Sequence, residues 1–324
     1  MITRFFLVSL LSIGAASAGN NELNGRQALS NMKQAMAELN YQGTVAFLKN
    51  GRLETMKYFH AAEKGVQQER LLSLNSPLRE IVRDADKVSC LFKSTQQIVV
   101  DHRPFGGSFL VDMPENLDEL SATYDFIKVG EEEVAMLPAY VVVVQPRDDF
   151  RYGKRLWLEQ QKFLPLKVEL YDGSGNTLEQ VVFTELQVKE TLPFVDVNLA
   201  QSAAAAGDVR HIHQLQPQSP DQATFVVGSL PPGFREIFFT RRSMHDSKQP
   251  VEHLVLSDGF ASVSIYLEKS SPSGAQAADN FQTLGAVNFF SRTLGGSLIT
   301  VMGEVPAKTV RFIAEGIKLR NSNE

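Results

Sequence analysis

The chain has 324 residues, of which 43% are hydrophobic and 21% are charged. This composition is typical of a folded globular protein rather than a disordered one. The formal net charge of −5 at pH 7 argues against nucleic acid as a partner, because nucleic-acid binding calls for a clustered basic surface. A chain of this length usually divides into more than one hydrophobic core, so we expect two domains.

The first eighteen residues have the order of a secretory signal peptide. A short basic start, Met1–Arg4, precedes the apolar run Phe5–Ile13, and Ala16-Ser17-Ala18 has the A-x-A pattern of a cleavage site. The apolar run is shorter than the roughly 20 residues that a membrane span needs. The residue directly after the expected cleavage point near Ala18 is Gly19 and not a cysteine, so we expect no lipid anchor. The sequence therefore predicts export, with residues 1–18 removed.

Residues 19–188 are expected to form the larger domain, which begins with a helix. Apolar residues recur with helical spacing on one stripe over residues 25–40, which predicts an amphipathic helix there. Asn50-Gly51 predicts a two-residue hairpin between strands 41–49 and 52–61. A second helix is expected to begin at Pro114 and to continue through Leu120. Further strands are expected at 67–74, 79–83, 88–92, 97–100, 124–129, 139–145, 152–159, 164–171 and 177–186.

Many short strands joined by turns predict a large antiparallel sheet that curls. Apolar residues alternate with polar ones or with Trp157 in strands 152–159 and 164–171, so one face is expected to be apolar and the other to meet water. Val141–Val144 is a continuous apolar run and is expected to be buried on both faces. An apolar concave face must be covered by helices or hold a ligand.

Residues 189–222 lose this periodicity, so we expect a flexible linker there. Residues 223–320 are expected to form a smaller α+β domain, with strands at 223–230, 234–240, 252–256, 261–269, 286–292 and 297–302. A helix opened by Pro306 is expected to complete it. The fold class is thus α+β, mostly antiparallel β.

Motifs for catalysis are absent from the sequence. We find no phosphate-binding G-x-x-x-x-G-K-[ST] loop, no G-x-S-x-G elbow and no H-E-x-x-H pair. His211 and His213 could chelate a metal, but they lie in the expected linker without a partner at fixed spacing. Cys90 is the only cysteine and is expected to be a small buried hydrophobe, with an intermolecular disulfide or a reactive thiol as alternatives. We therefore expect a non-enzymatic protein with no metal or cofactor.

Two segments are candidates for binding. Phe105, Phe109 and Leu110 belong to a glycine-bearing apolar loop, which can act as a movable flap over an apolar cavity or can simply fill the core. Arg241 and Arg242 end an expected strand. Such a pair is usually surface charge, but it could also grip a carboxylate or phosphate of a partner or anionic ligand.

With these segments placed, the chain resembles the RseB/MucB family of periplasmic regulators of an envelope-stress sigma factor. The stretches that carry the resemblance are spread over both expected domains. They are 41–44, 70–74, 79–83, 124–130, 147–153, 164–167, 230–234, Arg241-Arg242, 257–259 and 301–306.

The resemblance implies a large domain shaped as a half-open β-barrel like the lipoprotein carrier LolA, with helices inserted in its concave side. It implies a periplasmic protein that binds the periplasmic region of the anti-sigma factor RseA or MucA and shields it from the site-one protease DegS. Lipopolysaccharide or mislocalised lipoprotein would release it, and the family self-associates, so a homodimer is expected. The alternatives are a lipid or lipoprotein carrier of the LolA type and, more distantly, a hydrolase of envelope material.

Overall fold

The structure is a computed structural model that describes residues 23–75, 78–84, 87–92, 97–102, 107–195, 209–211, 218–243, 250–269 and 279–320. The expected signal peptide, Phe105 and His213 lie outside the described residues. Among the described helices, none is long and apolar enough to cross a membrane.

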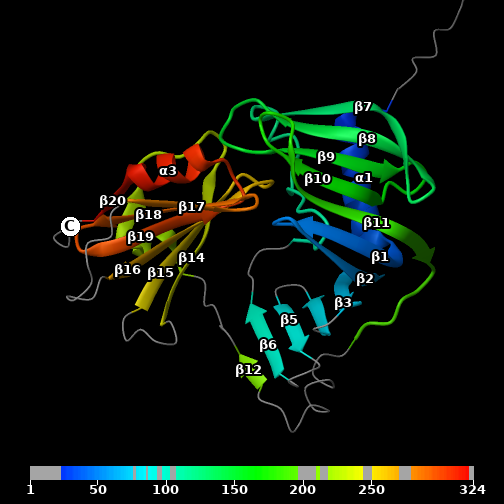
Figure 1. Ribbon diagram of the computed structural model, residues 1–324, viewed down its shortest axis with the longest axis horizontal. Helices are drawn as coiled ribbons and strands as arrows, with labels where there is room; N and C mark the ends of the chain where they lie inside the picture. Colours follow the sequence, from blue (N-terminus) through cyan, green and yellow to red (C-terminus); the bar gives the residue numbers. More distant parts are fainter. Residues whose placement is uncertain are drawn as a thin grey trace, which may run out of the picture.

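The described residues before position 212 form one sheet of twelve strands (Figure 1). Neighbours in this sheet run antiparallel, except that β12 is parallel to β6. The sheet order is β12-β6-β5-β4-β3-β2-β1-β11-β10-β9-β8-β7. The strands are β1 (Asn40–Lys49), β2 (Arg52–Glu63), β3 (Val66–Ser73), β4 (Arg79–Asp84), β5 (Lys87–Phe92), β6 (Gln97–His102), β7 (Tyr124–Val134), β8 (Leu137–Pro146), β9 (Gly153–Glu159), β10 (Pro165–Tyr171), β11 (Thr177–Lys189) and β12 (Val209–His211).

The predicted first helix is confirmed as α1 (Gly25–Glu38). Its N-cap is Asn24, whose side chain accepts a hydrogen bond from the Gln27 amide at 2.9 Å, a common way to satisfy a helix start. Helix α1 crosses behind strands β8 to β11 in Figure 1. Its buried stripe of Ala28, Leu29, Met32, Ala35 and Met36 joins the main core of this unit.

The sheet is open, because β7 and β12 lie at its two ends and do not pair with each other among the described strands. Val141 to Val144 are all buried, as predicted. The prediction that the second face only meets water is wrong near Trp157, which is 3% exposed and packs there with Ala139 and Leu166. A register shift between Pro165 and Lys167 places Leu166 in this outer cluster, whereas Val168 joins the main core.

The helix predicted from Pro114 through Leu120 is wrong. Residues 111–123 form bends and turns instead. Backbone carbonyls of Pro114 and Glu115 accept hydrogen bonds from the Lys33 ammonium, at 2.9 and 2.6 Å. The tertiary contacts to α1 satisfy groups that a helix would satisfy internally.

A second, six-stranded antiparallel sheet follows among the described residues, in the order β14-β15-β16-β19-β18-β17, and helix α3 (Ala307–Gly316) packs on β18 and β19 (Figure 1). The core between them includes Val310 and Ile313 of α3, the helix that the sequence predicts after Pro306. A short pair, β13–β20, extends this unit. The remaining elements are η1 (Pro220–Gln222), β13 (Phe225–Val227), β14 (Arg235–Ser243), β15 (Pro250–Ser257), β16 (Ser262–Lys269), β17 (Asn280–Leu284), β18 (Val287–Leu294), β19 (Ser297–Gly303) and β20 (Ile317–Leu319).

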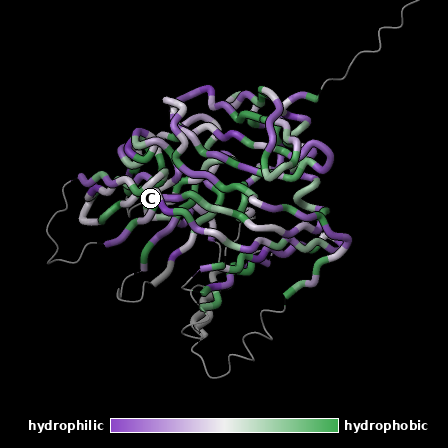
Figure 2. Tube along the Cα trace, turned by 45° about the vertical axis from the view of Figure 1, so that its right-hand side comes forward, coloured by the Kyte–Doolittle hydropathy of each residue, from purple (hydrophilic) through white to green (hydrophobic). Residues whose placement is uncertain are grey.

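The architecture of the described residues is therefore mostly antiparallel β with few helices, as predicted. Figure 2 shows hydrophobic and hydrophilic positions alternating along several strands, which is the pattern that the sequence carries. Within the expected linker, β12 pairs with β6, and residues 196–208 and 212–217 lie outside the described part.

Candidate functional site

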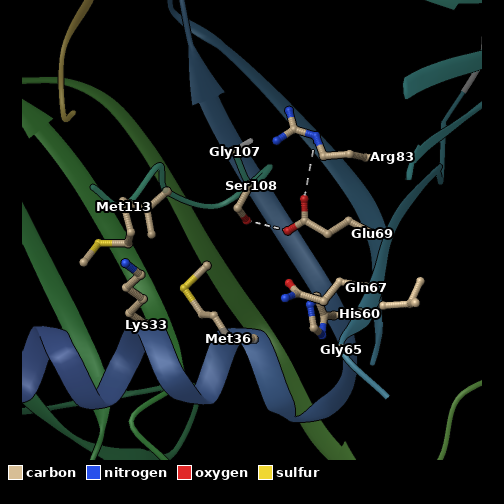
Figure 3. Close-up of a pocket in the computed structure, with 13 residues that line it drawn as sticks. Lys33, Met36, His60, Gly65, Gln67, Glu69, Arg83, Gly107, Ser108 and Met113 are labelled. Atoms are coloured by element: carbon tan, nitrogen blue, oxygen red, sulfur yellow. Dashed lines mark hydrogen bonds and ion pairs between the residues drawn. The ribbon is translucent and has the colours of Figure 1, made fainter. Parts of the chain in front are cut away.

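A cavity of about 490 Å³ opens between α1, the β2–β3 hairpin, β4 and the segment that begins at Gly107 (Figure 3). One part of its lining is apolar and another part is charged or polar. The lining residues are Lys33, Met36, Ala37, His60, Gly65, Val66, Gln67, Glu69, Arg83, Gly107, Ser108, Val111 and Met113.

Glu69 is the polar centre of this cavity and is only 6% exposed. Its carboxylate accepts hydrogen bonds from the Tyr58 hydroxyl at 2.7 Å, from the Ser108 hydroxyl and from the Phe109 amide at 3.0 Å. A buried carboxylate needs such donors, because removing its charge from water is otherwise costly. Glu69 on β3 therefore fixes the position of the segment that carries Ser108 and Phe109.

Arg83 lies directly opposite Glu69 in the β3–β4 pairing. Its Nε is 3.9 Å from Glu69 Oε2, and its guanidinium lies 4.7 Å from the centre of the Phe109 ring. That Nε is buried and has no hydrogen-bond partner among the described residues. Figure 3 shows Arg83 beside Gly107 at the rim of the cavity, so its guanidinium is placed to receive an anionic group.

Two buried tyrosines, Tyr41 and Tyr58, form a hydrogen-bonded group with Glu69. The hydroxyls of Tyr41 and Tyr58 are 3.3 Å apart, and the Tyr41 ring stacks on His60 at 4.8 Å. Burial, with the nearby charge of Glu69, raises the pKa of Tyr58 well above its ordinary value. Both phenols therefore stay neutral at physiological pH, and the Tyr58 hydroxyl donates to Glu69.

Two elements provide most of the apolar lining of the cavity, and Val66 of β3 adds to it. Met36 and Ala37 belong to α1, and Val111 and Met113 belong to the segment after Gly107. Figure 3 shows Met36 and Met113 on the side of the cavity opposite Glu69. Hydrocarbon and charged groups therefore line the same cavity.

Of the predicted flap residues, Phe109 and Leu110 lie near the cavity but do not line it. Leu110 is 7% exposed and packs in the main core, and Phe109 is partly buried against that core and under Arg83. Sequence reasoning missed Glu69 and Arg83. The available signal was a charged residue in the buried row of β3, where Glu69 shares a face with Leu71.

The predicted arginine pair lies elsewhere, on β14 of the second sheet. Arg241 Nε donates to Glu252 at 2.7 Å, and the same guanidinium donates to the Gln222 carbonyl. The Arg241 side chain is thus engaged within the unit, and the side chain of Arg242 lies outside the described part.

No group of three or more potential metal ligands occurs among the described residues. His211 is placed in β12. Cys90 on β5 is partly buried, in an environment intermediate between core and solvent.

Two family models match the chain. The model for the MucB/RseB N-terminal domain matches residues 24–205, and the model for the MucB/RseB C-terminal domain matches residues 219–318. The chain belongs to the RseB/MucB family. Its members are regulatory binding proteins and not enzymes.

Relatives cover nearly the whole chain. The sigma factor AlgU regulatory protein MucB of Pseudomonas aeruginosa is 30% identical over 96% of this chain and 95% of its own length. The sigma-E factor regulatory protein RseB of Escherichia coli K12 is 26% identical over 97% of both chains. The solved MucA/MucB complex of Pseudomonas aeruginosa matches with a TM-score of 0.71 and 27% identity, over 92% of this chain and 99% of that chain.

Proposed function

We propose that this protein is a periplasmic regulator that binds the periplasmic region of a membrane anti-sigma factor similar to MucA or RseA. Binding would shield that region from site-one proteolysis and so repress the sigma factor. The observation that carries the proposal is the full-length match to MucB as solved with the periplasmic part of MucA. Residues 1–18 would direct export, with cleavage near Ala18.

We further propose that the cavity beside Glu69 takes an acyl chain of lipopolysaccharide or mislocalised lipoprotein, in a curved sheet that serves as a half-open barrel of the LolA type. The volume of about 490 Å³, the two methionines and the position of Arg83 in the cavity lining support this proposal. Moving an equilibrium from 99:1 to 1:99 takes about 5.5 kcal/mol. Burial of roughly seven methylene groups in the released state alone would provide this difference, at about 0.8 kcal/mol each.

Competition between the two ligands tests the proposal. Calorimetry would measure the affinity of the chain from Gly19 for a synthetic periplasmic segment of the anti-sigma factor, with and without purified lipopolysaccharide. We expect lipopolysaccharide to weaken segment binding at least tenfold. If the segment did not bind, or if lipopolysaccharide did not compete with it, the proposed regulatory function would be contradicted.

The Arg83→Gln variant tests, in the same assay, whether the cavity is the site that binds lipopolysaccharide. We expect it to weaken lipopolysaccharide binding about tenfold, which corresponds to about 1.4 kcal/mol, while segment binding is kept. Arg79→Gln on the same strand is the matched control, since Arg79 pairs with Glu54 away from this cavity. Equal effects of the two variants would remove Arg83 from the ligand site.

The expected contacts of Arg241 and Arg242 with the partner remain part of the proposal. Reversing Arg241 would place a carboxylate beside Glu252, which is 4% exposed, so its effect would mix folding with binding. Arg242→Glu is therefore the cleaner variant, and we expect it to weaken segment binding at least tenfold.

A carrier of the LolA type is the second candidate, favoured by the open sheet and its cavity. A carrier would speed the transfer of a labelled lipoprotein from donor to acceptor vesicles in proportion to its concentration, whereas the regulator would bind the lipid and not accelerate transfer. We also propose that the protein forms a homodimer, which light scattering coupled to size-exclusion chromatography would detect.

A further inference from the structure

One irregular segment connects the cavity to the second sheet. Residues 107–123, which we name the strap, contain no helix or strand. The first part of the strap lines the cavity through Gly107, Ser108, Val111 and Met113. Any occupant of the cavity therefore contacts the strap directly.

The strap is held at this end by side chains of other elements. Glu69 accepts the hydrogen bonds of Ser108 and Phe109, and the Lys33 ammonium binds the carbonyls of Pro114 and Glu115. A segment fixed by a few side-chain bonds, without a ladder of its own, rearranges at lower cost than a strand or a helix.

The second part of the strap packs on a turn of the other sheet. Gly259, in the turn between β15 and β16, approaches so closely that a Cβ there would lie 2.8 Å from the Pro114 Cβ and 3.8 Å from Leu120 Cδ1. Gly259 has a φ of +103°, which favours glycine. The turn and the strap are therefore in direct van der Waals contact.

The next residue of the turn enters the core of the first unit. Phe260 is 6% exposed and packs in the same cluster as Leu117 and Leu120 of the strap. Its ring lies 5.4 Å from the ring of Tyr124, whose hydroxyl donates to Asp258 at 2.7 Å. The turn is thus held on both sides by the end of the strap and by the residue that follows it.

We propose that the strap is the element that couples the cavity to the second sheet. A ligand that displaces Ser108 to Met113 would shift Pro114 and Leu120 against Gly259 and Phe260, and the turn would transmit the shift to β15 and β16. This inference rests on the proposed function, in which cavity ligand and partner compete. It adds that the competition is allosteric, so the coupling is reciprocal between the two ligands.

Phe260→Leu and Phe260→Ala test the route in the full chain from Gly19. The affinity for the anti-sigma segment is measured without and with saturating lipopolysaccharide. The ratio of these two affinities measures the coupling between the two ligands. In the wild type we expect a ratio of at least ten. In Phe260→Ala we expect each ligand alone to bind within threefold of the wild type and the ratio to fall below three. Phe281→Ala is the control, because Phe281 is exposed on β17.

The outcomes separate the two proposals. A wild type without binding or competition contradicts the proposed function, and the inference with it. A wild-type ratio that persists in Phe260→Ala contradicts the strap route alone.

Hydrogen exchange in the wild type gives a second test that does not depend on how the variants fold. The amides of Phe109, of Thr123 and of Phe260 each donate a hydrogen bond that the structure defines. We expect saturating lipopolysaccharide to change protection of all three by at least threefold. A change confined to Phe109 would overturn the proposed route.

Discussion

The Nε of Arg151 lies 3.3 Å from Oδ2 of Asp258, and neither side chain has any exposed surface. Arg151 belongs to the connection between β8 and β9, and Asp258 belongs to the β15–β16 turn, so this ion pair joins the two sheets. The guanidinium lies between the rings of Tyr124 and Phe234, at 5.3 and 5.0 Å. The two units therefore share one buried, charged junction.

Arg151→Met should destabilise the protein by about 3–5 kcal/mol, because it leaves the Asp258 charge buried without its partner. Chemical denaturation would measure the free energy of unfolding. Arg147→Met is the matched control, since Arg147 pairs with Asp125 at the surface, where solvent screening leaves such pairs little effect on stability. Equal losses of unfolding free energy in both variants would show that the buried pair stabilises the protein no more than the surface pair does.

Gly259→Ala should destabilise the same junction. The alanine would adopt a φ of +103° and press its Cβ against Pro114, which together should cost at least about 2 kcal/mol. A Cβ at Gly173 meets nothing within 4 Å, so Gly173→Ala should stay within about 1 kcal/mol of the wild type. Thermal unfolding of both variants would check the difference, and a neutral Gly259→Ala would contradict the close packing of the turn.

Glu69→Gln should loosen the strap. A glutamine amide has one acceptor oxygen, so it cannot satisfy the Tyr58, Ser108 and Phe109 donors together, and the loss should be about 1–3 kcal/mol. Hydrogen exchange at the Phe109 amide should accelerate more than exchange in β9. Unchanged protection at Phe109 would mean that Glu69 does not hold the strap.

Stability should fall at alkaline pH because of buried tyrosines. Burial raises the pKa of Tyr41, of Tyr58 and of Tyr124 above the ordinary value of 10.0. The unfolded state loses these protons near pH 10 while the folded state keeps them, so the stabilisation is complete below pH 10 and is lost as the pH rises. Each phenol should contribute a slope of about 1.4 kcal/mol per pH unit.

Absorbance titration of the seven tyrosines would check this expectation. At least three of them should ionise only together with unfolding. Complete ionisation near pH 10 with the fold intact, as followed by circular dichroism, would contradict it.

Local patterns in the sequence were enough to predict most of the elements. Asn50-Gly51 specified a hairpin turn, and both residues have positive φ values of 53° and 69° in the structure. The apolar stripe of α1 and the proline before α3 predicted both helices. Strand β17 was missed, because all five of its residues are exposed and carry no alternation.

The signal-like start, the mostly antiparallel β architecture and the absence of catalytic motifs could all be read from local sequence patterns, since periodicity and turn chemistry act over a few residues. The meeting of Glu69 with Arg83, the irregular backbone of the strap and the entry of Phe260 into the core of the other unit could be seen only in the folded molecule. These features depend on strand register and on contacts between distant segments. Residues 69 and 108 meet only once the first sheet has formed, and residues 114 and 259 meet only once the two sheets pack together.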